Sequence, residues 1–273
     1  MSRCLYSFCL CAVLGSATAL ADDPVRVSLL TQTRQNISGE LLDGSAQGVT
    51  FLPSDQTKPL KVPAARIALL RFSLVSLGVD RIDEAYAAEK YQKAYSLLNE
   101  VLMPLKSYRD FQSNLLPYYQ KWMVAAYWAF DYDLVMELAA SLSRLSDDEF
   151  AAQIRFYRGL VTIAEGSDEE VADLMTSMDL DTVYPPGSAA RIYVDANLLK
   201  RNGEPVKAIR TAAQMISAYR TNPRWMARTH LLCEEIYFQM GMPAAGQAAL
   251  EDIKMFYSEP EILKKAAEIA AEK

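Results

Sequence analysis

The chain contains one histidine, His230, so any acid–base or nucleophilic chemistry that uses an imidazole must run through it. Cys233 follows three positions later and would lie on nearly the same face of a helix, as a Cys–His pair requires. The residues around both are strongly apolar, which favours another interpretation, two partly buried side chains in one core helix. One histidine and one cysteine outside the N-terminal segment cannot supply the usual zinc ligands.

Paired carboxylates are the other feature that could do chemistry. Two acidic clusters, at 147–149 and 168–170, each follow a serine and fit the first turn of a helix, where anions offset the positive end of the helix dipole. This placement explains them without a glycosidase-type pair. Gly39, Gly44 and Gly48 are spaced for hairpins and do not form a phosphate-binding loop. We therefore predict no catalytic residue, no metal site and no cofactor.

Binding chemistry is better represented, in a run of aromatic residues and in a concentration of basic ones. Seven aromatic residues fall between 118 and 132, and their spacing cannot place all of them in one core. Arg224 and Arg228 stand one helical turn apart and could clamp a carboxylate or a phosphate, although a solvated face balanced by acidic residues is the simpler alternative. The candidate partner-binding residues are Tyr119, Trp122, Trp128, Tyr132, Arg224 and Arg228.

The first part of the chain predicts short β-strands. Apolar bursts separated by turn residues indicate about five antiparallel strands, at residues 27–30, 37–42, 49–52, 60–62 and 67–72. So few short strands suit a small barrel, which would leave no exposed edges. Their order resembles the SH3-like and Sm-like barrels, whose members bind RNA or peptides, so the resemblance implies a fold and no particular function.

After Gly78 the apolar positions recur at intervals of three and four, which predicts helices. Helix starts are marked by capping boxes at Ser146 and Ser167 and by an Asn222–Pro223 N-cap. The segment 184–187, Tyr-Pro-Pro-Gly, must be a break.

Turns inside successive helix pairs are expected near Glu89, Asp131, Asp168, Gly203 and Gly241, a spacing that two helices and two turns would fill. The sequences around 126–133, 200–208 and 237–245 resemble the turn region of tetratricopeptide repeats, in which a small residue opens the second helix. The resemblance spans most of residues 82–273, without the family's early Trp and Leu-Gly positions. It implies an α-solenoid of stacked helix hairpins that binds proteins.

The N-terminal segment has the order of a secretory signal peptide. Arg3 precedes an apolar run from Cys4 to Leu14, and an Ala-x-Ala end follows at Ala19–Ala21. We expect cleavage after Ala21, which removes three of the four cysteines and leaves no transmembrane segment. The remaining Cys233 would be a small buried hydrophobe or an intermolecular disulfide partner.

These observations predict a mainly α protein with three parts: a signal peptide (1–21), a small antiparallel β-barrel (22–76) and a tetratricopeptide-like solenoid (77–273). The net charge of −6 disfavours a nucleic-acid partner. The favoured hypothesis is a periplasmic or secreted non-enzymatic adaptor that binds a protein or peptide. The alternative is an accessory factor that binds a cell-wall polymer or another anionic ligand through the Arg-rich repeat.

Overall fold

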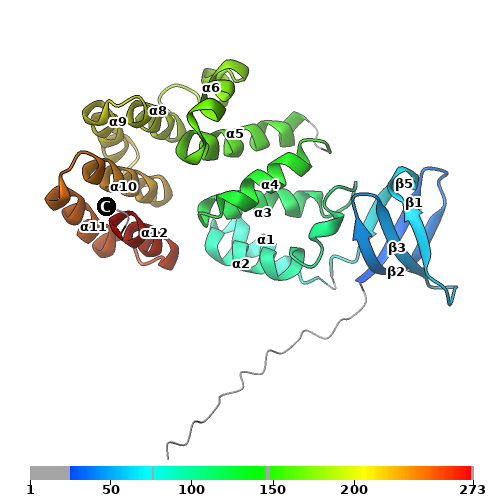
Figure 1. The fold of residues 1–273 in the computed structure, drawn as a ribbon. Coiled ribbons are helices and arrows are strands. Elements are labelled where there is room, and N and C mark those ends of the chain that lie inside the picture. Colours follow the sequence, from blue (N-terminus) through cyan, green and yellow to red (C-terminus); the bar gives the residue numbers. More distant parts are fainter. Residues whose placement is uncertain (1–24, 76, 146–147, 272–273) are drawn as a thin grey trace, which may run out of the picture.

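The computed structural model describes residues 25–75, 77–145 and 148–271. The predicted signal peptide and the capping box that starts at Ser146 fall on residues outside these ranges. The described chain has two parts that follow each other in sequence, a sheet and an array of helices (Figure 1). The change from period-two to helical patterning thus coincides with the change of architecture.

Five strands form one antiparallel sheet in the order β4-β3-β2-β1-β5. The strands are β1 (Val25–Thr31), β2 (Asn36–Ser45), β3 (Gly48–Pro53), β4 (Leu60–Pro63) and β5 (Ile67–Phe72). All five coincide with the predicted apolar bursts. Alternate residues such as Val27, Leu29, Phe51 and Leu70 are buried, so one face of the sheet carries its core.

The sheet is open, and the prediction of a closed barrel was wrong. The outer edge of β5 is occupied by the loop before α3: the Leu70 N–H donates to the Gln112 carbonyl at 2.9 Å. Asn114 then exchanges two hydrogen bonds with the Phe72 backbone, at 2.8 and 2.9 Å. Strand β4 is short and ends at Pro63, which cannot donate to a ladder. The helical part therefore covers the edge that closure would have needed.

Twelve α-helices follow in the described residues. A short 3-10 turn, η1 (Ala64–Arg66), joins β4 to β5, and a second, η2 (Lys106–Tyr108), lies between α2 and α3. The helices are α1 (Asp80–Ala87), α2 (Tyr91–Leu102), α3 (Leu116–Trp128), α4 (Tyr132–Leu142), α5 (Asp148–Glu165), α6 (Asp168–Ser177), α7 (Leu180–Val183), α8 (Ala189–Arg201), α9 (Pro205–Ala218), α10 (Pro223–Gln239), α11 (Pro243–Phe256) and α12 (Pro260–Ala271).

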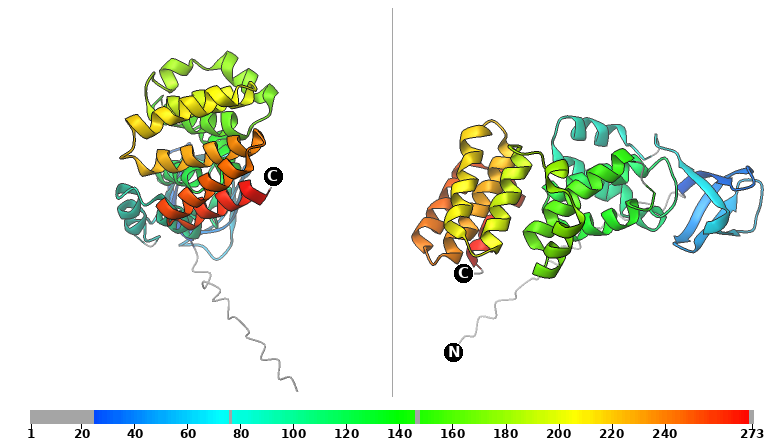
Figure 2. Two further views of the ribbon diagram at one scale, coloured as in Figure 1. Left: turned by 90° about the vertical axis from the view of Figure 1, so that its left-hand side faces the viewer. Right: turned by 90° about the horizontal axis from the view of Figure 1, so that it is seen from above.

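The helices pack as antiparallel hairpins, α1/α2, α3/α4, α5/α6, α8/α9 and α10/α11, and α12 packs on the last of them. The first helices of successive pairs touch one another in the order α3, α5, α8, α10, α12, and they form the inner layer of a curved stack (Figures 1 and 2). Each hairpin has an apolar face that it cannot bury alone, so stacking creates the core. The predicted α-solenoid is confirmed.

Four of the hairpin turns share one hydrogen-bond pattern. After α1, the Glu89 N–H donates to the Tyr86 carbonyl and the Lys90 N–H donates to the Ala85 carbonyl. The same two bonds recur after α3, α8 and α10. This is the Schellman motif, in which the residue after the helix adopts a left-handed conformation. The predicted turn positions near residues 89, 131, 203 and 241 thus mark a true structural repeat.

Helix starts follow the predicted capping chemistry. Ser167 and Glu170 form a complete capping box at α6. Asn222 accepts a hydrogen bond from the Trp225 N–H, and Pro223 takes the first position of α10. The predicted break at 184–187 lies between α7 and α8. No described helix combines the length and apolarity needed to cross a membrane.

Candidate functional site

A groove of about 750 Å³ crosses the inner layer of the solenoid. Its walls come from five places: the α1–α2 turn with the start of α2, the end of α3, the α9–α10 turn, the first turns of α10, and the start of α12. Figure 1 shows these elements facing one another where the stack curves back. Segments more than 130 residues apart in sequence therefore meet here. The groove brings together Tyr91, Trp128, Phe130, Arg224, Arg228 and Ile262.

Arg224, in the first turn of α10, reaches across the groove to the α1–α2 turn. One of its terminal nitrogens lies 2.7 Å from Glu89 Oε2. Its guanidinium lies 4.9 Å from the centre of the Tyr91 ring and 5.3 Å from that of Trp128, and these two rings are nearly parallel. The two cation–π contacts hold the guanidinium beside these rings while the side chain stays partly exposed. Arg224 is thus a pre-oriented cation in the groove wall.

Arg228 lies one turn further along α10 and is buried, with 2% of its surface exposed. It donates hydrogen bonds to the Tyr132 hydroxyl (2.7 Å) and to the Tyr127 carbonyl. Four rings surround its guanidinium, at 3.8 Å for Tyr127, 4.5 Å for Phe130, 5.1 Å for Trp128 and 5.7 Å for Tyr132. Its Nε makes no hydrogen bond within the described part of the chain.

The positive charge of Arg228 has no anionic partner among the described residues. Arginine stays protonated, so the charge cannot be avoided by losing a proton. Burial raises the pKa of Tyr127 well above its ordinary value, despite the opposing effect of Arg228, so this phenol stays neutral. A buried ion costs several kcal/mol, roughly, before its contacts are counted. The aromatic rings and the two hydrogen bonds are what offset that cost, without a carboxylate.

Two residues of the groove hold a strained backbone. Glu89 and Phe130 have φ values of 57° and 62°, in the left-handed region, at the Schellman position of their turns. The equivalent position carries Gly203 (φ 73°) after α8 and Gly241 (φ 66°) after α10. A non-glycine residue there costs about 1 kcal/mol or more. Both strained side chains line the groove, where glycine could supply neither a carboxylate nor a ring.

The six predicted binding residues fall into two groups. Trp128, Arg224 and Arg228 line the groove, and Tyr132 holds Arg228 from behind. Tyr119 and Trp122 are fully buried: the Tyr119 hydroxyl donates to the Leu105 carbonyl at 2.7 Å, and Trp122 Nε1 donates to Asn99 Oδ1 at 2.6 Å. These two side chains hold α3 against α2 and the segment that follows it, and they are not part of the groove lining.

Sequence reasoning missed Glu89, Tyr91 and Phe130 as site residues. The sequence does contain a signal for Glu89 and Phe130. They stand in the turns after α1 and α3 at the position where the turns after α8 and α10 carry glycine. Tyr91 opens α2 and stacks on Trp128, with ring centres 6.1 Å apart. Its role depends on the fold bringing α2 and α3 together, which no local pattern shows.

The basic run of the sequence comprises the lysines and arginines between 191 and 228, and most of them form ion pairs. Arg191 binds Asp181 and Asp195, Lys200 binds Glu235 and Arg201 binds Asp168. Arg201 also donates to three carbonyls at the end of α5. Within this run, the predicted pair of Arg224 and Arg228 differs from its neighbours because both face a groove.

His230 and Cys233 have the surroundings of packed core residues. The His230 ring lies 3.3 Å from the Tyr257 hydroxyl, and burial lowers the pKa of the imidazole. Burial raises the pKa of the Cys233 thiol to about 11, so thiolate is scarce at neutral pH. The described residues contain no cluster of three or more potential His, Cys, Asp or Glu metal ligands.

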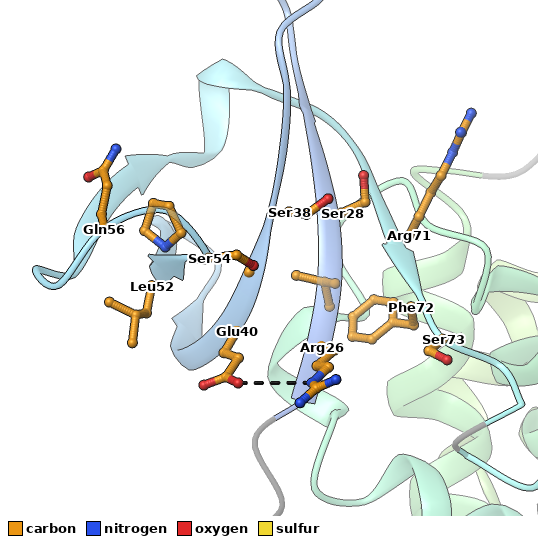
Figure 3. A pocket seen from close by; sticks show the side chains of 13 residues that line it. Arg26, Ser28, Ser38, Glu40, Leu52, Ser54, Gln56, Arg71, Phe72 and Ser73 are labelled. Carbon is orange, nitrogen blue, oxygen red and sulfur yellow. Dashed lines mark ion pairs between the residues drawn. The ribbon is translucent and has the colours of Figure 1, made fainter.

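The sheet carries a second hollow, of about 680 Å³, on the face opposite its core. Figure 3 shows its side chains: Arg26 and Glu40 form an ion pair at 4.0 Å, and Arg71 points away from them. Serines from neighbouring strands line the floor. Arg26 is largely exposed, so this hollow lacks the buried, fixed polar group that the solenoid groove has.

The repeated Schellman hairpins and the groove on their inner layer define a tetratricopeptide-like α-solenoid preceded by an open antiparallel sheet. No family model matches the chain, and no curated protein matches it. Among solved structures, it is similar to a chain described as "Crystal Structure of P58(IPK) TPR Domain", with 15% identity and a TM-score of 0.28. The match covers 73% of this chain and 66% of that one, just under two thirds of its length.

Proposed function

We propose that this protein is an exported, non-enzymatic adaptor that holds a protein or peptide segment in the groove of its solenoid. The observation that carries the proposal is the placement of pre-oriented aromatic and arginine side chains in one groove between distant repeats. Aromatic and arginine anchors in partly enclosed pockets provide most of the binding energy at protein interfaces. Its lining comes from several separate elements, so a bound segment would contact residues of distant repeats at once.

A blocking substitution tests the groove. Lys93 is exposed at the start of α2 and lines the groove, so Lys93→Trp would fill its mouth. Peptides selected from a random phage-displayed dodecapeptide library on the wild-type protein should bind Lys93→Trp about ten-fold more weakly by fluorescence anisotropy.

The matched control is Lys207→Trp, which places the same ring on exposed α9 outside the groove. It should leave the affinity unchanged. Equal binding by both variants, or no enrichment of any peptide on the wild-type protein, would contradict the proposal.

The anionic-ligand alternative depends on the same two arginines. Arg228, buried without a carboxylate partner in the described chain, is the observation that favours it. The substitution Arg224→Glu separates the two hypotheses, since loss of binding to a cell-wall polymer with retained peptide binding would favour an accessory factor for such polymers.

Export is proposed from the order of the first residues, with Arg3, an apolar run and the Ala19–Ala21 end. When the full chain is expressed in a bacterial host, mass spectrometry of the protein in the periplasmic or culture fraction should show Asp22 at its N-terminus. An uncleaved chain retained in the cytoplasm would refute export.

A further inference from the structure

We infer that the groove receives an acidic side chain from its partner, and that Glu89 occupies the place of that side chain while the groove is empty. This inference rests on the proposed function and specifies the chemistry of the partner. The segment would carry Asp or Glu within one or two residues of a large apolar side chain. The carboxylate would replace Glu89 on Arg224, and the apolar neighbour would lie against the aromatic wall.

The geometry of Arg224 supports an exchange of carboxylates. Its contact with Glu89 involves one terminal nitrogen and one carboxylate oxygen, at 2.7 Å. Glu89 remains 62% exposed in this pair, whereas Arg224 is only 28% exposed. An exposed ion pair contributes little to stability, so its acidic partner can be exchanged at small cost. The cation, by contrast, is held in place by Tyr91 and Trp128.

The backbone at Glu89 shows that this carboxylate is retained against a conformational cost. Its φ of 57° is one that glycine adopts freely, and the α8–α9 and α10–α11 turns use glycine at this position. The turn itself forms with the same hydrogen bonds whichever residue is present. Compared with glycine, Glu89 therefore adds only its side chain, and this side chain contacts Arg224. Strained residues of this kind gather at binding sites.

The charges of the groove indicate an acidic partner. Its lining includes four cations, Lys90, Lys93, Arg224 and Arg228, and two carboxylates, Glu89 and Glu259, although the whole chain is acidic. The four cations exceed the two carboxylates, so the lining has a net charge of +2 even with Glu89 counted. The buried charge of Arg228 adds to the attraction because the low-dielectric surroundings screen it weakly.

The residues beside Arg224 explain the expected apolar neighbour. Trp128, Phe130 and Ile262 line the same groove. All three are partly exposed, so their side chains are available for contact with a partner. An aromatic wall next to a fixed guanidinium fits a short sequence that combines one acidic and one apolar residue.

The test uses peptides from the random dodecapeptide selection described above, with the full folded protein. Enriched sequences should contain Asp or Glu within two positions of an aromatic or large aliphatic residue. A consensus peptide should bind Glu89→Gln about three-fold more tightly than the wild-type protein, because the competing carboxylate is gone. It should bind Arg224→Gln about ten-fold more weakly.

The matched control is Glu259→Gln, which removes the same charge from the groove wall without releasing Arg224. Its affinity should stay within about 1.5-fold of the wild-type value. If Glu89→Gln and Glu259→Gln gain the same affinity for the peptide, the effect comes from the overall charge of the groove and not from the release of Arg224. This result would overturn the inference. Enriched peptides without acidic residues, bound independently of Arg224, would also overturn it while leaving the proposed function intact. If no peptide is enriched on the wild-type protein, both the inference and the proposed function would be contradicted.

A second measurement separates strain from charge. Glu89→Gly should relieve the left-handed backbone, raise the thermal midpoint by about 2 °C and bind the consensus peptide as Glu89→Gln does. A lower midpoint for Glu89→Gly would show that Glu89 is kept for stability, and the exchange of carboxylates would be refuted.

Discussion

Replacement of Arg228 by alanine is expected to destabilise the protein by about 3 kcal/mol, because it empties a cage of four aromatic rings. It also removes hydrogen bonds to the Tyr132 hydroxyl and the Tyr127 carbonyl, which leaves that carbonyl without this donor. In thermal unfolding followed by circular dichroism, the midpoint should fall by roughly 6 to 12 °C.

Arg228→Met is the informative control. Methionine fills much of the same volume and contacts aromatic rings well, but it brings no buried charge. Its stability should lie within about 1 kcal/mol of wild type, since the desolvation cost disappears together with the cation–π contacts. Peptide binding should nevertheless fall as far as in Arg228→Ala. If Arg228→Met is as unstable as Arg228→Ala, the arginine is a structural residue, and its place in the binding site would have to be abandoned.

Local patterns were sufficient to predict most of the secondary structure. The five strands and the Ser167 and Asn222 helix starts depend on neighbours within a few residues, which the sequence displays directly. The turns at Gly203 and Gly241 could be predicted because glycine tolerates the left-handed backbone of the Schellman motif. The turns near Glu89 and Asp131 could be predicted only from the spacing of the repeat. Whether the sheet closes could not be predicted from the sequence. It depends on whether the Gln112–Asn114 segment occupies the edge of β5, and this contact joins residues more than forty positions apart.

The site was predicted only in part for the same reason. Arg224 and Arg228 share a helix face, so their proximity follows from spacing alone. Tyr119 and Trp128, both on α3, were equally good candidates for partner binding in the sequence. Helical spacing shows which residues share a face, but it does not show which neighbouring element covers that face. The structure buries Tyr119 against the Leu105 carbonyl and leaves Trp128 beside Arg224. The meeting of α10 with the α1–α2 turn comes from the curvature of the whole stack.

The buried Glu234 on α10 gives the protein an unusual pH dependence. The residue is 0% exposed, and neither carboxylate oxygen makes a hydrogen bond within the described part of the chain. Burial raises its pKa to about 7, with Lys254 on α11 opposing the effect. Because the folded pKa exceeds the unfolded value of 4.5, the folded state binds the extra proton, and stability should rise as pH falls from about 8 to 5.

Glu234→Met should remove this dependence, since it keeps the volume and has nothing to titrate. At pH 8 the shift in the pKa corresponds to a cost of at most about 3 kcal/mol, so the variant should be more stable than wild type by up to that amount. At pH 5 the difference attributable to ionisation should fall below about 1 kcal/mol. The difference in urea unfolding free energy between variant and wild type isolates Glu234, because His230, whose lowered pKa acts in the opposite direction, is present in both. A difference that stays constant from pH 5 to 8 would mean that Glu234 is solvated or paired in solution.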